Sequence, residues 1–226
     1  MPLLTPDLLL YAYASGLFPM ADDREDPSIH WVDPERRGMI PLDRFHVPRR
    51  LARIIRQQRF EIRTDTAFSD VILACAESRP NRPRTWLNDE LIGLYCDLHE
   101  LHYAHSIECW RDDKLVGGAY GVSLGGAFFG ESMFSLERDA SKVALAALVD
   151  RLNQGGYRLL DTQFLTDHLS QFGAVEISRD AYQRRLKEAL GVQAVFYSDG
   201  GAIVSSTPWT FSSEANGSSQ STTHIS

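Results

Sequence analysis

Three consecutive strands are predicted by residues 104–134, AHSIECWRDDKLVGGAYGVSLGGAFFGESMF. In this segment the apolar pattern changes to the period of two that is typical of strands. The predicted strands are Ala104 to Arg111, Lys114 to Val122 and Ala127 to Phe134. Turn sequences, Asp112-Asp113 and Leu124-Gly-Gly126, separate them. The segment therefore predicts a meander of antiparallel hairpins at the centre of a sheet.

Helices on either side of the meander are predicted from apolar residues at helical spacing and from capping residues. The predicted helices are Leu8 to Ser15, residues 47–58, Ala67 to Ser78, Asn88 to Leu101, Ala140 to about Asn153, a short helix from Thr166 or Asp167, and Arg179 to Leu190. Asp139 is the predicted N-cap of the helix that begins at Ala140. Further strands are predicted at Phe60 to Thr64 and Arg158 to Gln163. This order predicts an α/β (α+β) fold, with a mixed, largely antiparallel sheet flanked by helices.

The chain has 226 residues, of which 43% are hydrophobic, and this is enough for a substantial core. Two prolines and Gly38 between Trp31 and Pro41 place a boundary near residue 37. We therefore expect a small N-terminal domain over residues 1–36, a main domain over 37–195 and a C-terminal extension over 196–226. The Ser/Thr/Asn/Gly-rich end of the extension predicts disorder from about residue 207.

Three features of the sequence indicate a compartment. No apolar run is long enough to cross a bilayer, and the first residues lack the basic flank of a secretory signal. Cys75, Cys96 and Cys109 are odd in number and lack the spacing of a disulfide framework or a zinc site. We expect a cytoplasmic protein with reduced thiols that does not associate with membranes and is a monomer.

The net charge of −7 is unevenly distributed. Residues 44–63 contain seven arginines and a single acid, Glu61, so this window carries a charge of +6. Apolar residues at helical spacing predict that one face of the 47–58 helix is buried. Arg49, Arg53 and Arg56 share another face. Two interpretations stay open, a solvated helix face and a patch that binds phosphate groups.

Polar residues interrupt otherwise apolar segments at three places. These are Gly130-Glu-Ser-Met-Phe-Ser135, Asp139-Ala-Ser-Lys142 and Asp161-Thr-Gln163. A polar group in an apolar setting costs about 1–3 kcal/mol unless it is hydrogen-bonded. Asp161 and Gln163 are two residues apart on a predicted strand, so their side chains are expected to share one face and to converge. These segments are the predicted functional site.

Several motifs in this order resemble the leucyl/phenylalanyl-tRNA–protein transferase family. They are Leu17-Phe-Pro19, Trp31, Thr85-Trp86, His105-Ser-Ile-Glu108, Gly117-Gly-Ala-Tyr-Gly-Val122, Gly130-Glu-Ser-Met-Phe-Ser135, Ala140-Ser-Lys142, Asp161-Thr-Gln163, His168 and Phe172-Gly-Ala-Val-Glu-Ile177. The resemblance implies a small N-terminal domain and an acetyltransferase-like (GNAT-like) catalytic domain that acts without metal or coenzyme. It also implies the reaction, transfer of Leu or Phe, less readily Met, from aminoacyl-tRNA to proteins that begin with Lys or Arg. This transfer marks the acceptor protein for degradation.

The resemblance assigns roles to the polar residues. Asp161 and Gln163 are the expected catalytic pair, which binds the attacking amine and polarises the ester, and the alternative for Asp161 is a strand-end carboxylate that caps Thr166 or bonds a nearby amide. Glu131 is expected to bind the Lys or Arg side chain of the acceptor. The alternative for Glu131 is an ion pair with Arg138 or Lys142.

The resemblance also assigns the groups that bind the donor. The expected pocket for the Leu or Phe side chain is formed by Phe128, Met133, Leu148, Leu152 and Leu160, which would otherwise be interpreted as core. Trp86, Tyr95 and Met20 are expected near the terminal adenosine of the tRNA, where rings stack on a base. Met20 stands where the family usually has tryptophan. Arg49, Arg50, Arg53 and Arg56 are the expected contacts with the tRNA backbone.

Three alternatives were weighed against this interpretation. His99, His102 and His105 are evenly spaced, but no acidic ligand completes a zinc set, so we expect no metal site. An acyl-CoA-dependent N-acyltransferase would need a glycine-rich turn before a helix, whereas Ser135 to Asp139 has no glycine and two acids. The third alternative is a non-catalytic module that binds aminoacyl-tRNA or a peptide.

Overall fold

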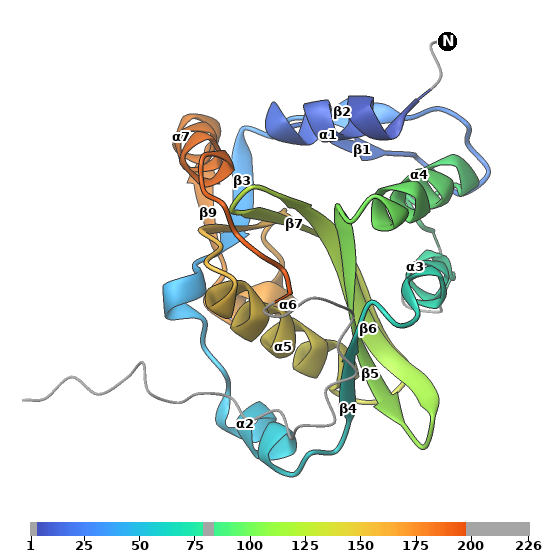
Figure 1. Ribbon diagram of the computed structural model, residues 1–226, viewed down its shortest axis with the longest axis vertical. Coiled ribbons are helices and arrows are strands. Elements are labelled where there is room, and N and C mark those ends of the chain that lie inside the picture. Colours follow the sequence, from blue (N-terminus) through green and yellow to red (C-terminus); the bar gives the residue numbers. More distant parts are fainter. Residues whose placement is uncertain (1–3, 79–83, 198–226) are drawn as a thin grey trace, which may run out of the picture.

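The computed structural model describes residues 4–78 and 84–197. Its centre is a seven-stranded sheet with helices on both faces (Figure 1). In spatial order the strands are β4 (Glu61–Thr64), β5 (Ala104–Arg111), β6 (Lys114–Leu124), β7 (Ala127–Ser135), β8 (Leu159–Gln163), β3 (Arg36–Ile40) and β9 (Val175–Ser178). Every neighbouring pair is antiparallel except β7 and β8, which are parallel. The predicted fold class, a mixed and largely antiparallel sheet flanked by helices, is confirmed.

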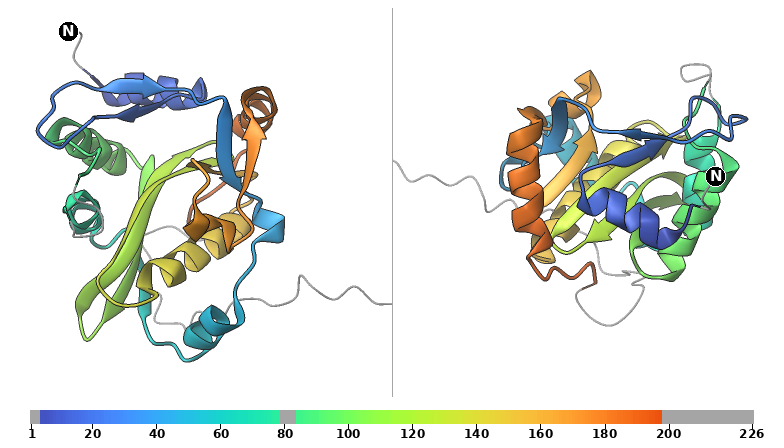
Figure 2. Two further views of the ribbon diagram at one scale, coloured as in Figure 1. Left: turned by 180° about the vertical axis from the view of Figure 1, so that it is seen from behind. Right: turned by 90° about the horizontal axis from the view of Figure 1, so that it is seen from above.

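The helices bury two separate hydrophobic clusters against the sheet. On one face lie α2 (Arg49–Arg56), α5 (Ala140–Gln154) and the short α6 (Asp167–Ser170). The 3-10 turn Leu42–Arg44 packs against the same cluster. On the other face lie α1 (Pro6–Ala14), α3 (Phe68–Ala76), α4 (Asp89–Glu100) and α7 (Arg179–Leu190). Seen from above, α1 lies across the end of the molecule between α4 and α7 (Figure 2). The apolar stripes that predicted these helices are the buried ones, for example Leu51, Ile54 and Ile55 in α2.

Capping residues mark most helix starts as predicted. The side chains of Thr5, Asn88, Thr166 and Ser178 each accept a backbone N–H of the first turn. Asp139 occupies the predicted N-cap position of α5, but its side chain accepts no backbone N–H of the first turn. Its backbone is left-handed, with φ 70°, and its carboxylate lies 3.1 Å from Arg50 and 3.5 Å from Lys142. The negative charge is therefore used to neutralise two cations.

Four short strands were missed by the sequence analysis. β1 (Phe18–Met20) and β2 (His30–Val32) form a two-stranded sheet, while β3 and β9 form the edge of the large sheet. The prolines and Gly38 around Arg36 led to the prediction of a domain boundary near residue 37. Instead β3 pairs with β8 on one side and with β9 on the other. Pairing between segments more than a hundred residues apart has no local pattern.

The sequence also predicted a disordered C-terminal end and no segment that crosses a membrane. The disorder predicted from about residue 207 lies outside the described residues. None of the helices within 4–78 and 84–197 combines the length and apolar character needed to span a bilayer.

A buried ion pair joins two neighbouring strands of the large sheet, β3 and β8. The Arg37 guanidinium on β3 donates to both carboxylate oxygens of Asp161 on β8, with Nη2–Oδ2 at 2.6 Å and Nε–Oδ1 at 2.9 Å. The side chains are 1% and 0% exposed, respectively. Arg37 also donates to the carbonyl of Gly16, and its guanidinium lies 4.5 Å from the ring centres of Phe18 and Tyr182. One side chain thus contacts α7, the large sheet and the start of the chain.

A bulge in β7 changes which residues face each side of the sheet. Tyr120 pairs with Ser132 and Gly121 pairs with Gly130, so Glu131 is an extra residue without a partner on β6. Phe128 and Met133 therefore pack with the α5 side, and Phe129 and Phe134 pack with the α3 side. Gly121 allows this close approach, because a Cβ there would lie 2.2 Å from the Phe129 carbonyl oxygen.

Replacing one partner of the buried ion pair should be costly. We expect Arg37→Ala to lower the free energy of unfolding by about 3–5 kcal/mol, because it leaves the Asp161 charge buried and unpaired. The adjacent Arg36 pairs with Glu176 at 3.2 Å on the surface, so Arg36→Ala should cost about 0–1 kcal/mol. Urea denaturation measures both. Equal losses for the two variants would contradict the importance of the buried pair.

The bulge provides a second test of the fold. We expect Gly121→Ala to lower the free energy of unfolding by about 1–3 kcal/mol, because the new methyl group meets backbone that cannot move aside. The control is Gly93→Ala in α4, where a Cβ meets nothing within 4 Å. That change should be neutral or stabilise the helix by up to about 1 kcal/mol. A stable Gly121→Ala protein, measured by thermal unfolding, would mean that the strands can separate there.

Candidate active site

A cavity of about 270 Å³ lies where β7 and β8 separate. The two strands pair only from Ala127↔Leu159 to Phe129↔Asp161. Beyond that point β7 continues beside β6, and β8 ends at Gln163, where it still pairs with β3. The residues that follow the last paired positions, from Gly130 to Met133 on one strand and Thr162 and Gln163 on the other, form two walls of the cavity. The divergence of the strands therefore creates the site.

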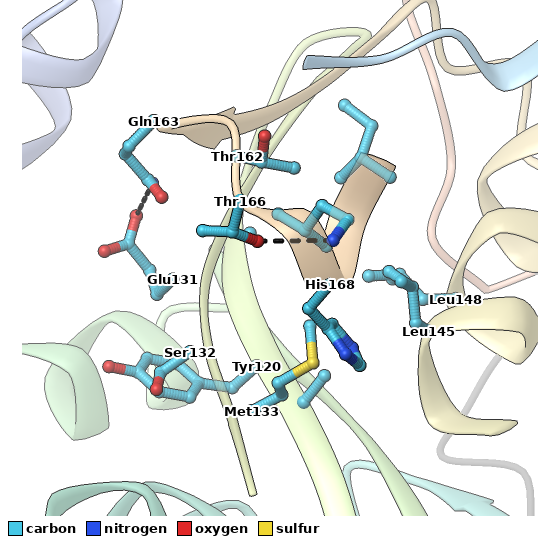
Figure 3. Close-up of a pocket in the computed structure, with 14 residues that line it drawn as sticks. Tyr120, Glu131, Ser132, Met133, Leu145, Leu148, Thr162, Gln163, Thr166 and His168 are labelled. Carbon is cyan, nitrogen blue, oxygen red and sulfur yellow. Dashed lines mark hydrogen bonds between the residues drawn. The ribbon is translucent and has the colours of Figure 1, made fainter. Parts of the chain in front are cut away.

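The body of the cavity is apolar. Met133, Leu148 and Leu160 were predicted as pocket residues, and all three line it. Figure 3 shows Met133 and Leu148. Phe128 and Leu152 do not line it, because both are fully buried in the core next to α5, so this part of the prediction is wrong. Other lining residues, which come from β6, α5, β8, and α6 with its N-cap, were not predicted as pocket residues. These are Ala119, Leu145, Thr162, Thr166, His168 and Leu169.

Two polar side chains meet at one end of the cavity. Gln163 Nε2 donates to Glu131 Oε1 at 3.2 Å, and both residues line the cavity (Figure 3). The bulge brings Glu131 to this position from β7, and Gln163 reaches it from the end of β8. His168 lies at the other end, beside Met133 and Leu145 (Figure 3). Burial lowers the pKa of His168, and the nearby Lys142 charge acts in the same direction, so this ring is neutral at pH 7.

Asp161 and Gln163 do not converge, so the expectation of a shared face is wrong. Asp161 lies outside the cavity wall, and its oxygens accept bonds from Arg37, from the Tyr182 hydroxyl at 2.8 Å and from the Gln163 backbone N–H at 2.9 Å. Gln163 has a left-handed backbone, φ 57°, which ends the alternation of the strand. The carboxylate that bonds a nearby amide was the alternative left open for Asp161.

Glu131 belongs to a hydrogen-bonded chain that reaches into the protein. Its Oε2 accepts from the Tyr95 hydroxyl at 3.0 Å, and the Tyr95 and Tyr13 hydroxyls are 2.7 Å apart. Burial raises the pKa of the Glu131 carboxyl to about 7, although the two phenols act in the opposite direction. The alternative partners of Glu131, Arg138 and Lys142, instead approach Asp139.

The three residues expected near a nucleoside have different environments. Tyr95 is 0% exposed, and its ring packs edge-on against Trp86 and Tyr120, so it has no free face for stacking and this expectation is wrong. Trp86 and Met20 are partly exposed. They lie on neighbouring segments, because the N–H of Ala21 donates to the carbonyl of Trp86 at 3.1 Å.

The arginines of α2 form an exposed basic face. Arg49, Arg50, Arg53 and Arg56 are all exposed, as predicted for one side of an amphipathic helix. Arg50 lies 3.1 Å from Asp139, whereas the structure pairs none of Arg49, Arg53 and Arg56 with an acid from the described residues. These three side chains are available to an anionic partner.

The histidines of the 99–105 segment make local contacts. His99 Nδ1 lies 2.8 Å from the carbonyl oxygen of Ala104, and His105 Nδ1 lies 2.7 Å from Asp65 Oδ2. Three possible metal ligands do approach one another elsewhere in the described part of the chain: Asp22 and Asp26 on the loop between β1 and β2, and His30 at the start of β2. These residues are far along the chain from the cavity.

Comparison with solved structures yields weak similarities. A functionally unknown conserved protein from Staphylococcus epidermidis is 11% identical, with 77% of this chain and 65% of that chain covered and a TM-score of 0.39. AAC(6')-Iy in complex with a CoA bisubstrate analogue is 17% identical, with 63% and 99% covered and a TM-score of 0.33. Neither TM-score is high enough to support a conclusion about this chain.

Comparison of sequences is decisive. A family model described as leucyl/phenylalanyl-tRNA protein transferase matches residues 39–187, and a model of the N-terminal domain of the same family matches residues 3–35. Transferases with this name from Phenylobacterium zucineum and Paramagnetospirillum magneticum are 62% and 60% identical, covering 87% and 85% of this chain and 89% and 92% of theirs. The relative from Caulobacter vibrioides is 61% identical, with 85% and 89% covered. The chain therefore belongs to the leucyl/phenylalanyl-tRNA protein transferase family and is an aminoacyltransferase enzyme.

Proposed function

We propose that this enzyme moves Leu or Phe, and less readily Met, from aminoacyl-tRNA to the N-terminal amine of proteins that begin with Lys or Arg. The transfer marks these proteins for proteolysis. The transferase acts in the cytoplasm, as a monomer and without metal or coenzyme. The observation that carries this proposal is the apolar cavity of about 270 Å³ with an amide and a carboxylate at one end. Its volume is just below the roughly 300–1,000 Å³ of pockets for whole small molecules, so it suits a single side chain.

The chemistry needs little more than positioning. An aminoacyl ester is already activated, so attack by an amine requires the two groups to be held in contact and a proton to be moved. With the donor side chain inside the cavity, its ester lies at the end formed by Glu131 and Gln163. The Gln163 amide can then donate to the ester carbonyl, where negative charge develops during attack.

Asp161 serves the reaction indirectly. Its carboxylate is fully buried and accepts the Gln163 backbone N–H, which holds the left-handed turn that aims the Gln163 side chain at the cavity. We therefore assign Asp161 as a positioning residue. Glu131 is the carboxylate at the cavity that contacts the N-terminal residue of the acceptor.

Selectivity for the donor follows from the apolar walls. A charged or polar side chain would lose its hydration without finding partners among Met133, Leu145, Leu148 and Leu160. Apolar side chains that differ by one methylene are separated by only about 1–3 kcal/mol, which explains tolerance of more than one donor amino acid.

The tRNA would contact two surfaces. Trp86 and Met20 are partly exposed on adjoining segments and could hold the terminal adenosine between a ring and a thioether. The exposed arginines of α2 would contact the phosphate backbone. The acyl-CoA alternative has weaker support, because the turn before α5 has no glycine and holds Asp139 in place of an anion-binding loop.

A transfer assay tests the proposed function. Charged Leu-, Phe- and Met-tRNA are incubated with peptides that differ only in their first residue, and acetyl-CoA is the control donor. We expect products from Lys- and Arg-starting peptides with Leu and Phe, less with Met, and none with acetyl-CoA. Leu148→Trp should abolish transfer of Phe by filling the cavity while tRNA binding persists. Transfer from acetyl-CoA, or bound tRNA without transfer by the wild type, would support one of the alternatives.

The basic face of α2 is tested by salt dependence. Replacing Arg53 and Arg56 with Gln should weaken tRNA binding and reduce the slope of log affinity against log salt by about 1–2, because each phosphate contact contributes roughly 0.7–0.9. The matched control replaces Arg184 and Arg185, which are exposed on α7. Identical slopes in both double variants would mean that the α2 arginines only solvate the helix.

A further inference from the structure

Two buried tyrosines connect the N-terminal helix to the carboxylate at the cavity. Tyr13 lies on α1, Tyr95 on α4 and Glu131 in the bulge of β7, and both tyrosine side chains are 0% exposed. Tyr95 donates its one hydroxyl proton to Glu131 at 3.0 Å, so the 2.7 Å contact between the two hydroxyls is a bond donated by Tyr13. The chain of donors therefore runs in one direction, from Tyr13 through Tyr95 to Glu131.

The phenols remain donors at every physiological pH. Burial raises the pKa of Tyr13 and of Tyr95 well above the usual value, and the Glu131 charge acts in the same direction. They cannot serve as bases themselves. A hydrogen bond donated to a carboxylate stabilises its charged form, so these two residues favour an ionised Glu131 in a setting that otherwise disfavours charge.

Other charged and titratable groups also act on Glu131 from the elements around it. They are Asp161 on β8, Arg37 on β3, Tyr120 on β6 and Tyr182 on α7. The Asp161 and Arg37 charges form one neutral pair and act on Glu131 in opposite directions. The balance leaves the carboxyl with a pKa of about 7, which lies close to the pKa of roughly 7.7–8.0 of an α-amino group.

Of the carboxylates of Asp161 and Glu131, only that of Glu131 is placed to accept the proton of the acceptor amine. Asp161 is enclosed by three sets of donors and has no surface at the cavity, whereas Glu131 lines the cavity beside the Gln163 amide. An amine that attacks an ester polarised by Gln163 must therefore arrive next to Glu131, because the two side chains are in contact. A base with this position meets the distance requirement of general base catalysis.

We propose that Glu131 is the base that accepts the proton of the acceptor α-ammonium, and that Tyr95 and Tyr13 are positioning residues that hold its carboxylate ionised and aimed at the amine. This proposal rests on the proposed function and deepens it. It changes the expected role of Glu131, which was an ion pair with the Lys or Arg side chain of the acceptor.

The proton balance of the step is complete. The ammonium transfers one proton to the Glu131 carboxylate, and the nitrogen lone pair then forms the C–N bond with the ester carbonyl carbon. When the ester C–O bond breaks, the second proton of the nitrogen passes to the departing ribose oxygen. Glu131 releases its proton to solvent after turnover, so the products are the amide, the free tRNA and one proton.

The experiment compares pH profiles of kcat/KM for the acceptor peptide at saturating Leu-tRNA. Titration of the peptide amine is common to all variants, so differences report on the enzyme. We expect an acidic limb near pH 7 in the wild type, because protonated Glu131 cannot accept a proton. Tyr95→Phe should move this limb to higher pH by about one unit, and Tyr13→Phe should move it in the same direction, because both phenols lower the pKa of Glu131. Tyr11→Phe is the control, because this phenol is on the same helix and 71% exposed.

Glu131→Gln separates the two roles of the carboxylate. As a base, its loss should remove the limb that belongs to Glu131, leave only the titration of the peptide amine, and lower kcat by about 10²–10⁴-fold for every acceptor, whatever its first side chain. A raised KM for Lys- and Arg-starting peptides with kcat unchanged would overturn the proposal. Loss of activity in Tyr95→Phe without movement of the limb would also overturn it, since that is the effect of a purely structural residue.

A measurement on the wild type reads the ionisation of the Glu131 carboxyl directly. In protein labelled with ¹³C at the glutamate carboxyl, the resonance absent from Glu131→Gln belongs to Glu131. Titration near pH 7 supports the proposal, and titration near the ordinary glutamate value overturns it. Wild-type protein that binds charged tRNA but never transfers the amino acid would instead contradict the proposed function.

Discussion

The buried ion pair between Arg37 and Asp161 is the constraint on which the site depends. Two charges are removed from water, and this is tolerable only because donors surround the carboxylate and a carbonyl and two rings surround the guanidinium. The same carboxylate holds the backbone N–H of Gln163 in a left-handed turn. An interaction that joins β3, β8 and α7 therefore also sets the direction of a side chain at the cavity.

Around this constraint, the site combines residues from the whole chain. Glu131 reaches the cavity because a bulge adds one residue to β7, and Gln163 reaches it because β8 ends there. Tyr13 and Tyr95 come from helices on the opposite face of the sheet. Tyr95 contacts the carboxylate from behind, and Tyr13 contacts Tyr95. The result is an apolar cavity with one polar end, which suits a reaction whose substrate is already activated and whose amine must lose a proton.

The apolar residues that the sequence predicted for the pocket divide into some that line the cavity and some that belong to the core. Met133, Leu148 and Leu160 line the cavity as expected, but Phe128 and Leu152, which have the same chemistry, belong to the core. Periodicity identifies residues that avoid water and cannot tell a core from an empty pocket. Tyr95 was expected to stack on a base, yet its environment is fully buried. No local pattern indicated Tyr13 as its partner, or Arg37 and Tyr182 as the partners of Asp161.

The amino-acid sequence by itself determined the β5–β6–β7 meander, the helices with their apolar faces and caps, and the family, because these depend on local periodicity, turn residues and motif order. It did not reveal β1, β2, β3 or β9, which are short and pair with distant segments. Only the tertiary structure decided that Asp161 turns away from the cavity and that Glu131 faces it. Those directions depend on a bulge, a left-handed residue and a buried cation from β3, and the positions of these groups in space are set by long-range packing.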